Sequence, residues 1–246
     1  MEVICMHAVG ITHIGKVREQ NQDAIFVKSE GYMNLPNLFI VADGLGGHLA
    51  GSVASNTAME AFCNFLYDHK PTKHIENSLV SALCVANEQV YNDAVKNKEH
   101  KGMGTTFSVV VVHEEKVHYA HVGDSRVYLI KDDAMTQITK DHFSLTADMV
   151  RDGVITQEEA KKYPASVLTR AIGTDLDVKI DKGVVALEGA SHILICSDGL
   201  TNMVDNENIL KIIKNFENLE QATQALIDAA LDGGGLDNIS AILVAC

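Results

Sequence analysis

The chain has 246 residues, of which 46% are hydrophobic and three are proline, so it can bury a large core and is not disordered in bulk. Lys and Arg number 20 against 33 Asp and Glu, and the resulting net charge of −13 disfavours nucleic-acid and membrane-surface binding. No apolar run approaches the about 20 residues that span a bilayer, and the first residues do not have the pattern of a secretion signal. We therefore expect one cytoplasmic domain over residues 1–246.

The cysteines are too few and too scattered to form a thiolate site. No Cys-x-x-Cys pair occurs, which gives a tetrahedral zinc site little support, and no cysteine has an arginine six residues later, as a thiolate phosphatase loop requires. We interpret all of them as structural: Cys5, Cys63, Cys84, Cys196 and Cys246.

The first half of the chain alternates short apolar runs with periodic segments. Apolar or β-branched runs predict strands, and apolar residues at helical spacing predict helices. In chain order, we expect a strand at 38–42, helices at 52–67 and 75–96, a hairpin of strands 108–112 and 117–122, and a strand at 126–130.

The second half begins with a capping-box pattern, Thr156 to Glu159, which predicts a short helix ending near Tyr163. Further on, we expect a strand at 193–196, helices at 209–216 and 221–230, and a final strand at 239–244. Strands come in hairpin-like groups instead of strict strand–helix alternation, so the sequence favours an α+β fold with antiparallel sheets over a doubly wound fold.

Four aspartates lie at ends of predicted strands beside glycine or a turn. Asp43 and Asp198 each follow an apolar run and precede glycine, Asp124 lies between two strands, and Asp237 precedes the last strand. Each alone is more simply a turn residue. Together, in a chain without a thiolate site, they suggest an all-oxygen site for hard divalent cations.

Such a site needs an anionic substrate, and Arg18 is a candidate to hold it because a guanidinium group matches phosphate oxygens with two parallel hydrogen bonds. Alone, Arg18 is more simply a surface residue. Competing motifs are absent: the chain has no P-loop and no Gly-x-Ser-x-Gly turn. Asp175 and Asp177 resemble an aspartyl-phosphate pair but follow Gly173-Thr174 instead of a buried strand, so we interpret them as a solvated loop.

An ordered set of motifs runs along nearly the whole chain, from about Val9 to Val244. The motifs are Arg18-x-x-Asn21-Gln22-Asp23, Val41-Ala42-Asp43-Gly44-Leu45-Gly46-Gly47-His48-x-Ala50-Gly51, Gly104-Thr105-Thr106, His121-Val122-Gly123-Asp124-Ser125-Arg126, Asp141-His142, Thr169-Arg170-Ala171-Ile172-Gly173, Ser197-Asp198-Gly199-Leu200 and Asp237-Asn238-Ile239. In this order they resemble the metal-dependent serine/threonine protein phosphatases of type 2C, also called PPM, and in particular a bacterial-type member.

The resemblance implies a four-layer αββα sandwich, in which two central antiparallel sheets are flanked by helix pairs and a flap subdomain covers about 141–168. It also implies two Mn²⁺ or Mg²⁺ ions in the core site and a third, weaker site. Asp43 would bridge the two core ions with help from the Gly44 carbonyl, and Asp198 and Asp237 would complete the first ion's ligands. Asp23 would orient water from the next shell, and Asp124 with Asp198 would form the third site.

The remaining roles concern the substrate. By resemblance, Arg18 would clamp the phosphate, and His48 would either protonate the leaving alcohol or shape its loop. A hydroxide between the two ions would attack phosphorus directly, so no covalent phosphoenzyme is needed. Segments after Asp141-His142 and around Tyr163 depart from the usual bacterial pattern, which bears on substrate preference.

The implied partners are phosphorylated proteins and a serine/threonine kinase that the enzyme opposes, and the family implies a monomer. Two alternatives stay open: a phosphatase of one phosphorylated regulator, of the partner-switching kind, and a catalytically dead family member that acts as a regulatory module. A small-molecule phosphatase is a weaker third option, because it would need a closed pocket.

Overall fold

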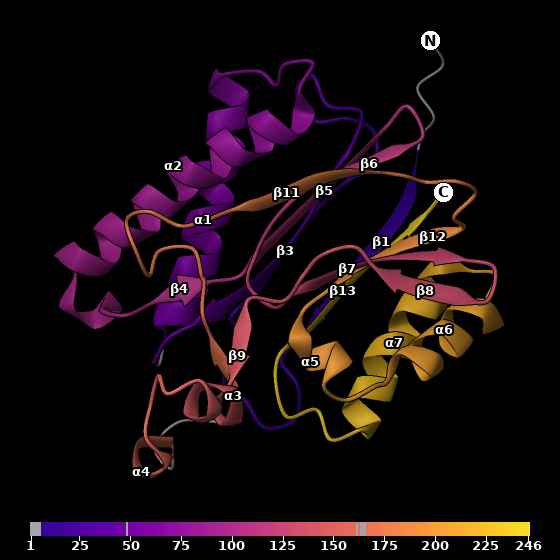
Figure 1. Ribbon diagram of the computed structural model, residues 1–246. Helices are drawn as coiled ribbons and strands as arrows, with labels where there is room; N and C mark the ends of the chain where they lie inside the picture. Colours follow the sequence, from indigo (N-terminus) through magenta and orange to yellow (C-terminus); the bar gives the residue numbers. More distant parts are fainter. Residues whose placement is uncertain (1–5, 48, 161, 163–165) are drawn as a thin grey trace.

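Two antiparallel β-sheets stack face to face in the computed structural model, which describes residues 6–47, 49–160, 162 and 166–246 (Figure 1). One sheet has the strand order β11-β6-β5-β3-β2, with the short β4 paired to β3, and the other has the order β1-β13-β12-β7-β8. The strands of the first are β2 (Asp23–Lys28), β3 (Leu38–Leu45), β4 (Gly104–Thr105), β5 (Phe107–His113), β6 (Lys116–Val122) and β11 (Asp181–Ala186). Those of the second are β1 (His7–His13), β7 (Arg126–Lys131), β8 (Ala134–Gln137), β12 (His192–Cys196) and β13 (Ile239–Ala245).

Helices cover the outer face of each sheet, which gives the four-layer αββα sandwich that the resemblance implied (Figure 1). The first sheet packs against α1 (Ala50–Asp68) and α2 (Ile75–Lys96), which is followed by the 3-10 turn η1 (Lys98–His100). The second packs against α5 (Asp198–Thr201), α6 (Asn206–Asn215) and α7 (Leu219–Asp232). Within the described residues, no helix is both long and apolar enough to cross a membrane.

Strand β3 shows why the central strands are apolar on both faces. Leu38 and Ile40 pack toward α1 and α2, whereas Phe39 and Val41 pack between the sheets. Successive side chains of a strand point to opposite faces, so a strand with helices on one side and a sheet on the other needs apolar residues at every position. The same alternation occurs in β12, where Ile193 and Ile195 face the other sheet and Leu194 faces the helices.

The long periodic segments were predicted accurately. Helix α2 has the predicted bounds, and α1 extends the predicted 52–67 to Ala50–Asp68. The predicted hairpin is confirmed: β5 and β6 pair from His113↔Lys116, and Glu114 and Glu115 of its turn have φ of 49° and 56°. The helix predicted at 209–216 differs at both ends, because α6 begins at Asn206, capped by Asp205, and ends at Asn215.

Strands β1, β2, β8 and β11 were not predicted, because their exposed or partly buried positions interrupt the apolar pattern. The predicted strand at 38–42 also continues to Leu45, which places Asp43 and Gly44 inside β3 instead of after it. This extension matters for the site, because a residue within a paired strand has a fixed partner on the neighbouring strand.

The flap lies between β7–β8 and β11 and contains β9 (Phe143–Leu145), α3 (Thr146–Arg151), α4 (Gln157–Ala160) and β10 (Ser166–Leu168) (Figure 1). Strands β9 and β10 pair with each other and, among the described residues, with no strand of the two large sheets. The capping box is confirmed: the Thr156 backbone N–H donates to Glu159 at 2.8 Å, and the Glu159 N–H donates to Thr156 Oγ1 at 3.2 Å. The predicted end of this helix near Tyr163 lies outside the described residues.

Candidate active site

Five predicted carboxylates meet at one end of the sandwich, where strands of both sheets end. Asp23 and Asp43 face each other in the β2–β3 register. Asp198 follows β12 and Asp237 precedes β13, and these strands are antiparallel neighbours. The pKa of Asp43 is raised well above its usual value, by burial first and then by the charges of Asp23, Asp198, Asp124 and Asp237. A single carboxyl group therefore experiences all four of the others.

Asp43 is held through its backbone by two neighbouring threonines. The Asp43 carbonyl accepts from the Thr106 N–H at 2.8 Å and from Thr105 Oγ1 at 2.9 Å, and the Asp43 N–H donates to Thr106 Oγ1 at 2.9 Å. Burial and then the charge of Asp237 raise the pKa of Asp198, and a hydrogen bond with Asp43 partly offsets this. Neighbouring buried carboxyl groups oppose each other's ionisation.

Asp23 lies 8% exposed between the two sheets and is held by serines of the second sheet. One carboxylate oxygen, Oδ2, accepts from Ser197 Oγ at 2.9 Å and from Ser240 Oγ at 2.6 Å. The other, Oδ1, is buried without a hydrogen-bond partner. Burial raises the pKa of Asp23 to about 6, and the two serine hydroxyls only partly offset this. A buried carboxylate oxygen without a donor costs free energy, which a cation-bound water would relieve.

Asp124 lies in the connection between β6 and β7, at the edge of the same cluster. Burial, followed by the charge of Asp198, raises its pKa to about 7. Asp124 is therefore tied electrostatically to Asp198, the residue with which the resemblance pairs it.

Arg18 and Asp237 form an ion pair, with Arg18 Nη2 donating to Asp237 Oδ2 at 2.7 Å. Asn238, which is 4% exposed, fastens the loop that carries Arg18: its side-chain amide donates to the carbonyls of Ile14 and Gln20 at 2.8 and 2.9 Å, and its Oδ1 accepts from the Gln22 N–H. Contacts between residues near opposite ends of the sequence thus place the arginine at the carboxylate cluster.

Gly44 lies where its backbone has no room for a side chain. A Cβ atom there would stand 2.1 Å from the Gly51 carbonyl oxygen of α1 and 2.6 Å from the Gln22 carbonyl oxygen. The start of α1 therefore lies directly against the end of β3, which only glycine at position 44 permits. His48, predicted in the loop between them, lies outside the described residues.

The donor chemistry fits a hard divalent cation, because the clustered groups are carboxylates and one buried oxygen of Asp23 is unpaired. The cluster is not packed as a ready metal cage: among the residues that the structure describes, no three histidine, cysteine or acidic side chains form one. Asp237 is engaged by Arg18 instead, and Asp43 is engaged by Asp198. Cation binding therefore requires these carboxylates to exchange their present partners.

The base of the flap is fastened to the same end of the sandwich. Arg126 of β7 binds both oxygens of Asp141, with its shortest contact at 2.7 Å. His142, 4% exposed, accepts from the Gly123 N–H at 3.1 Å and contacts Asp181, which also pairs with Arg170 at 3.0 Å. The flap is therefore joined to the loop that carries Asp124.

Several supporting residues had no predicted role. Ser197, Thr105, Thr106 and Asn238 lie within the quoted motifs, so the motif positions already pointed to them. Ser240 lies outside the motifs, and its only signal is its place two residues after Asn238, near the start of β13.

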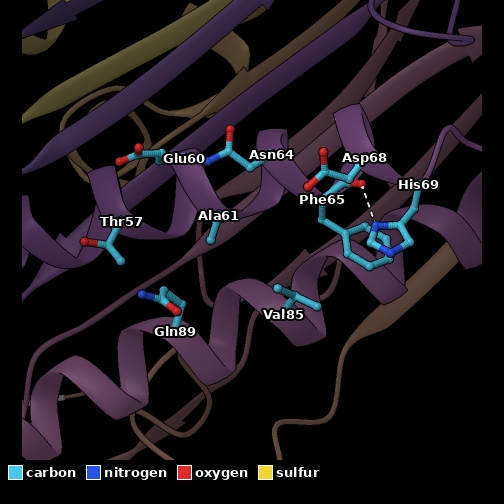
Figure 2. A pocket seen from close by; sticks show the side chains of 9 residues that line it. All are labelled: Thr57, Glu60, Ala61, Asn64, Phe65, Asp68, His69, Val85 and Gln89. Carbon is cyan, nitrogen blue, oxygen red and sulfur yellow. Dashed lines mark hydrogen bonds between the residues drawn. The ribbon is translucent and has the colours of Figure 1, made fainter.

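A hollow on the helical side of the first sheet does not belong to this site. Figure 2 shows it between α1 and α2, where Ala61 and Phe65 of α1 face Val85 and Gln89 of α2, and its volume is about 440 Å³. The dashed contact in the figure is His69 Nδ1 against the Phe65 carbonyl oxygen, at 3.3 Å. The residues that line this hollow include none of the predicted site residues.

Comparison with known proteins agrees with this arrangement. The model of the family described as protein phosphatase 2C matches residues 9–232. The "Serine/threonine phosphatase stp" of Listeria innocua is 35% identical over 245 residues, which is 97% of this chain and 95% of that protein. The crystal structure of the serine/threonine phosphatase Stp1 from Staphylococcus aureus has a TM-score of 0.85 and 34% identity, covering 98% of this chain and 95% of that one. That of the Mycobacterium tuberculosis phosphatase PstP/Ppp has a TM-score of 0.81 and 30% identity, covering 98% of each chain.

A two-sheet sandwich with a carboxylate cluster at one end defines the PPM class of phosphatase, a class of metal-dependent enzymes. The chain belongs to the protein phosphatase 2C family and is a serine/threonine phosphatase of the bacterial type. The predictions of family, fold and enzyme class are confirmed. The clustering of all the predicted carboxylates argues against the alternative of a catalytically dead regulatory module.

Proposed function

We propose that this phosphatase hydrolyses phosphoserine and phosphothreonine in proteins with two Mn²⁺ or Mg²⁺ ions at the carboxylate cluster. Asp43, Asp198 and Asp237 would hold the two ions together with the Gly44 carbonyl, and Asp124 with Asp198 would hold a third, weaker one. The observation that carries this proposal is the crowding of carboxylates at Asp43, whose pKa is raised by burial first and then by the charges of four other aspartates. Like charges gathered at one point are unfavourable unless a cation joins them.

In the reaction, water forms a bond to phosphorus while the bond from phosphorus to the serine or threonine oxygen breaks, which yields inorganic phosphate and the free hydroxyl group. Divalent cations bound here would supply the positive charge that lowers the pKa of water and neutralises phosphate oxygens. The protein supplies the positions of the reacting groups, and the backbone contacts of Asp43 with Thr105 and Thr106 preorganise the central carboxylate.

Arg18 would bind the phosphate. Its side chain is 53% exposed, and Nη2 is directed to Asp237, so the rest of the guanidinium group can meet two phosphate oxygens at once. Binding of cations to Asp237 would compete for the same carboxylate and turn the arginine toward the substrate.

Asp23 would orient a water molecule through its unpaired Oδ1, while Ser197 and Ser240 keep Oδ2 fixed. The departing oxygen needs a proton, and we keep His48 as the candidate donor on the strength of the motif. Its substitution by alanine should slow turnover more for an alkyl phosphate than for an aryl phosphate, because an alkoxide leaves less readily.

The biological setting follows from the same chemistry. We propose that the chain acts as one catalytic domain and as a monomer in the cytoplasm, where it opposes a serine/threonine kinase. The names of the relatives support protein substrates but specify no kinase. Deleting the gene and comparing phosphoproteomes would test this: many kinase targets should gain phosphate, whereas a change confined to one regulator would support the partner-switching alternative.

The direct test is hydrolysis of a phosphothreonine peptide by the purified protein with Mn²⁺, with Mg²⁺ and with EDTA. Asp198→Ala should strongly reduce turnover, whereas Asp177→Ala, the same change in the exposed loop, should preserve it. Isothermal titration with Mn²⁺ gives a readout besides activity, and Asp198→Ala should weaken binding. Full turnover in EDTA would overturn the metal assignment, and no turnover with either metal would favour a dead regulatory module.

A further inference from the structure

Two large aliphatic side chains are exposed immediately beside the proposed phosphate clamp. Val17, which precedes Arg18, is 61% exposed, and Leu236, which precedes Asp237, is 56% exposed. Single exposed aliphatic residues are common on protein surfaces and need no explanation. These two differ because each adjoins a member of the Arg18–Asp237 ion pair.

The two loops that carry them lie side by side in a fixed register. The Lys16 N–H donates to the Gly235 carbonyl at 2.7 Å, and Arg18 donates to Asp237 at 2.7 Å. Both contacts join residues with the same separation along the chain, and Val17 and Leu236 are the residues between the joined positions. The two exposed aliphatic residues therefore belong to adjoining loops.

The loops are also packed closely against each other. A Cβ atom at Gly15, whose φ is +83°, would stand 2.2 Å from the Asp237 carbonyl oxygen, and one at Gly235 would stand 3.2 Å from the Lys16 backbone nitrogen. The Leu236 side chain lies over Gly234, with Cγ 3.6 Å from where a Cβ atom would be. The aliphatic surface is therefore built before any substrate arrives, which lowers the cost of binding to it.

We propose that Val17 and Leu236 form an apolar rim that selects protein segments with a large aliphatic residue next to the phosphorylated serine or threonine. This inference rests on the proposed function, because it assigns Arg18 to the phosphate. A segment whose phosphate is held at Arg18 must pass the residues that flank the arginine and its partner. An aliphatic neighbour would then cover Val17 and Leu236 and remove their surface from water, whereas a serine neighbour would cover little apolar surface.

The test compares two phosphothreonine peptides that differ only in the residues flanking the phosphothreonine, leucine in one and serine in the other, with Mn²⁺ present. The wild-type protein should prefer the leucine peptide by roughly three- to tenfold in kcat/KM, mainly through KM, as expected for partial burial of one aliphatic side chain. The Val17→Ser/Leu236→Ser double variant should lose this preference. Val184→Ser, at a position 44% exposed on β11, is the matched control and should retain it.

Val17→Thr keeps the shape of valine and serves as a second variant if the double variant does not fold; it should reduce the preference. Equal rates for the two peptides with the wild-type protein, or a preference that survives substitution of both residues, would overturn the rim. Failure to hydrolyse either peptide with Mn²⁺ would instead count against the proposed function, so the two failures are distinguishable.

Discussion

Asp23 and Asp43 lie in paired strands of one sheet, whereas Asp198 begins α5 after β12 and Asp237 lies in the turn before β13 of the other. The first two are held by dense hydrogen bonding: Asp43 through its backbone with Thr105 and Thr106, and Asp23 through two serine hydroxyls. The second two lie outside the strands and accept hydrogen bonds through their carboxylates. Asp198 accepts from Asn202 at 3.0 Å, and Asp237, whose side chain is 36% exposed, accepts from the Asn238 N–H at 2.8 Å and from Arg18 at 2.7 Å.

This difference suggests that the two sheets have different roles at the site. The first sheet places residues 23 and 43 at positions that strand pairing fixes. The second presents carboxylates that can exchange partners, from Arg18 and Asp43 to a cation.

Asp43→Asn should cause the largest loss, because the central carboxylate contributes charge to every neighbour. Turnover of a phosphothreonine peptide should fall by roughly 10²–10³ or more, the range for losing a key electrostatic group. The fold should persist, since the backbone contacts of residue 43 do not depend on its side chain. Activity assays with circular dichroism would check both points, with Asp177→Asn as the control; turnover at the wild-type rate would refute the central role.

The contribution of Asp23 and Asp124 to the free energy of unfolding in chelator should decrease as pH rises. The pKa of Asp23 is raised from 3.8 to about 6, and that of Asp124 to about 7, so the folded state holds protons that the unfolded state releases. The stabilisation that this provides is present below about pH 4 and is lost as pH rises toward 7, on the order of 2–3 kcal/mol for Asp23.

Thermal melts in EDTA between pH 4 and 8 would measure this loss, and Asp124→Asn should flatten its upper part. Added Mn²⁺ should oppose the loss, because a cation favours the ionised carboxylates. An Asp124→Asn variant whose melting temperature in EDTA changes with pH as that of the wild type does would contradict the raised pKa of Asp124.

Arg18→Lys should lower kcat/KM by about tenfold, because lysine keeps the charge but cannot donate two parallel hydrogen bonds to phosphate. Steady-state kinetics on the peptide and on p-nitrophenyl phosphate would separate KM from kcat. An unchanged kcat/KM on both substrates would show that the guanidinium group does not hold the phosphate.

Asp124→Ala should have the smallest effect, a reduction in rate of roughly a few fold, because Asp124 lies at the edge of the cluster and leaves the other four carboxylates in place. Titration with Mn²⁺ should show loss of a weak binding step while the tight steps remain. A loss as large as that of Asp43→Asn would move Asp124 into the central set.

Much of this protein was determined by local pattern. The apolar run in β3, the periodicity of α2 and the Thr156–Glu159 capping box each depend on residues close in sequence, and each formed as predicted. The order of the motifs also indicated the family and the candidate carboxylates. Turns that hold aspartate beside glycine need particular residue types at short spacing, so they can be recognised in the sequence.

Only the tertiary structure decided which of these residues meet. Asp23 faces Asp43 because β2 and β3 pair in one register, and its serine partners come from positions 197 and 240, on the other sheet. Arg18 reaches Asp237 because β1 pairs with β13, which joins the two ends of the chain. Strand pairing over such separations depends on burying both faces of the two sheets and on completing their backbone hydrogen bonds, and neither condition is written in any short stretch of sequence.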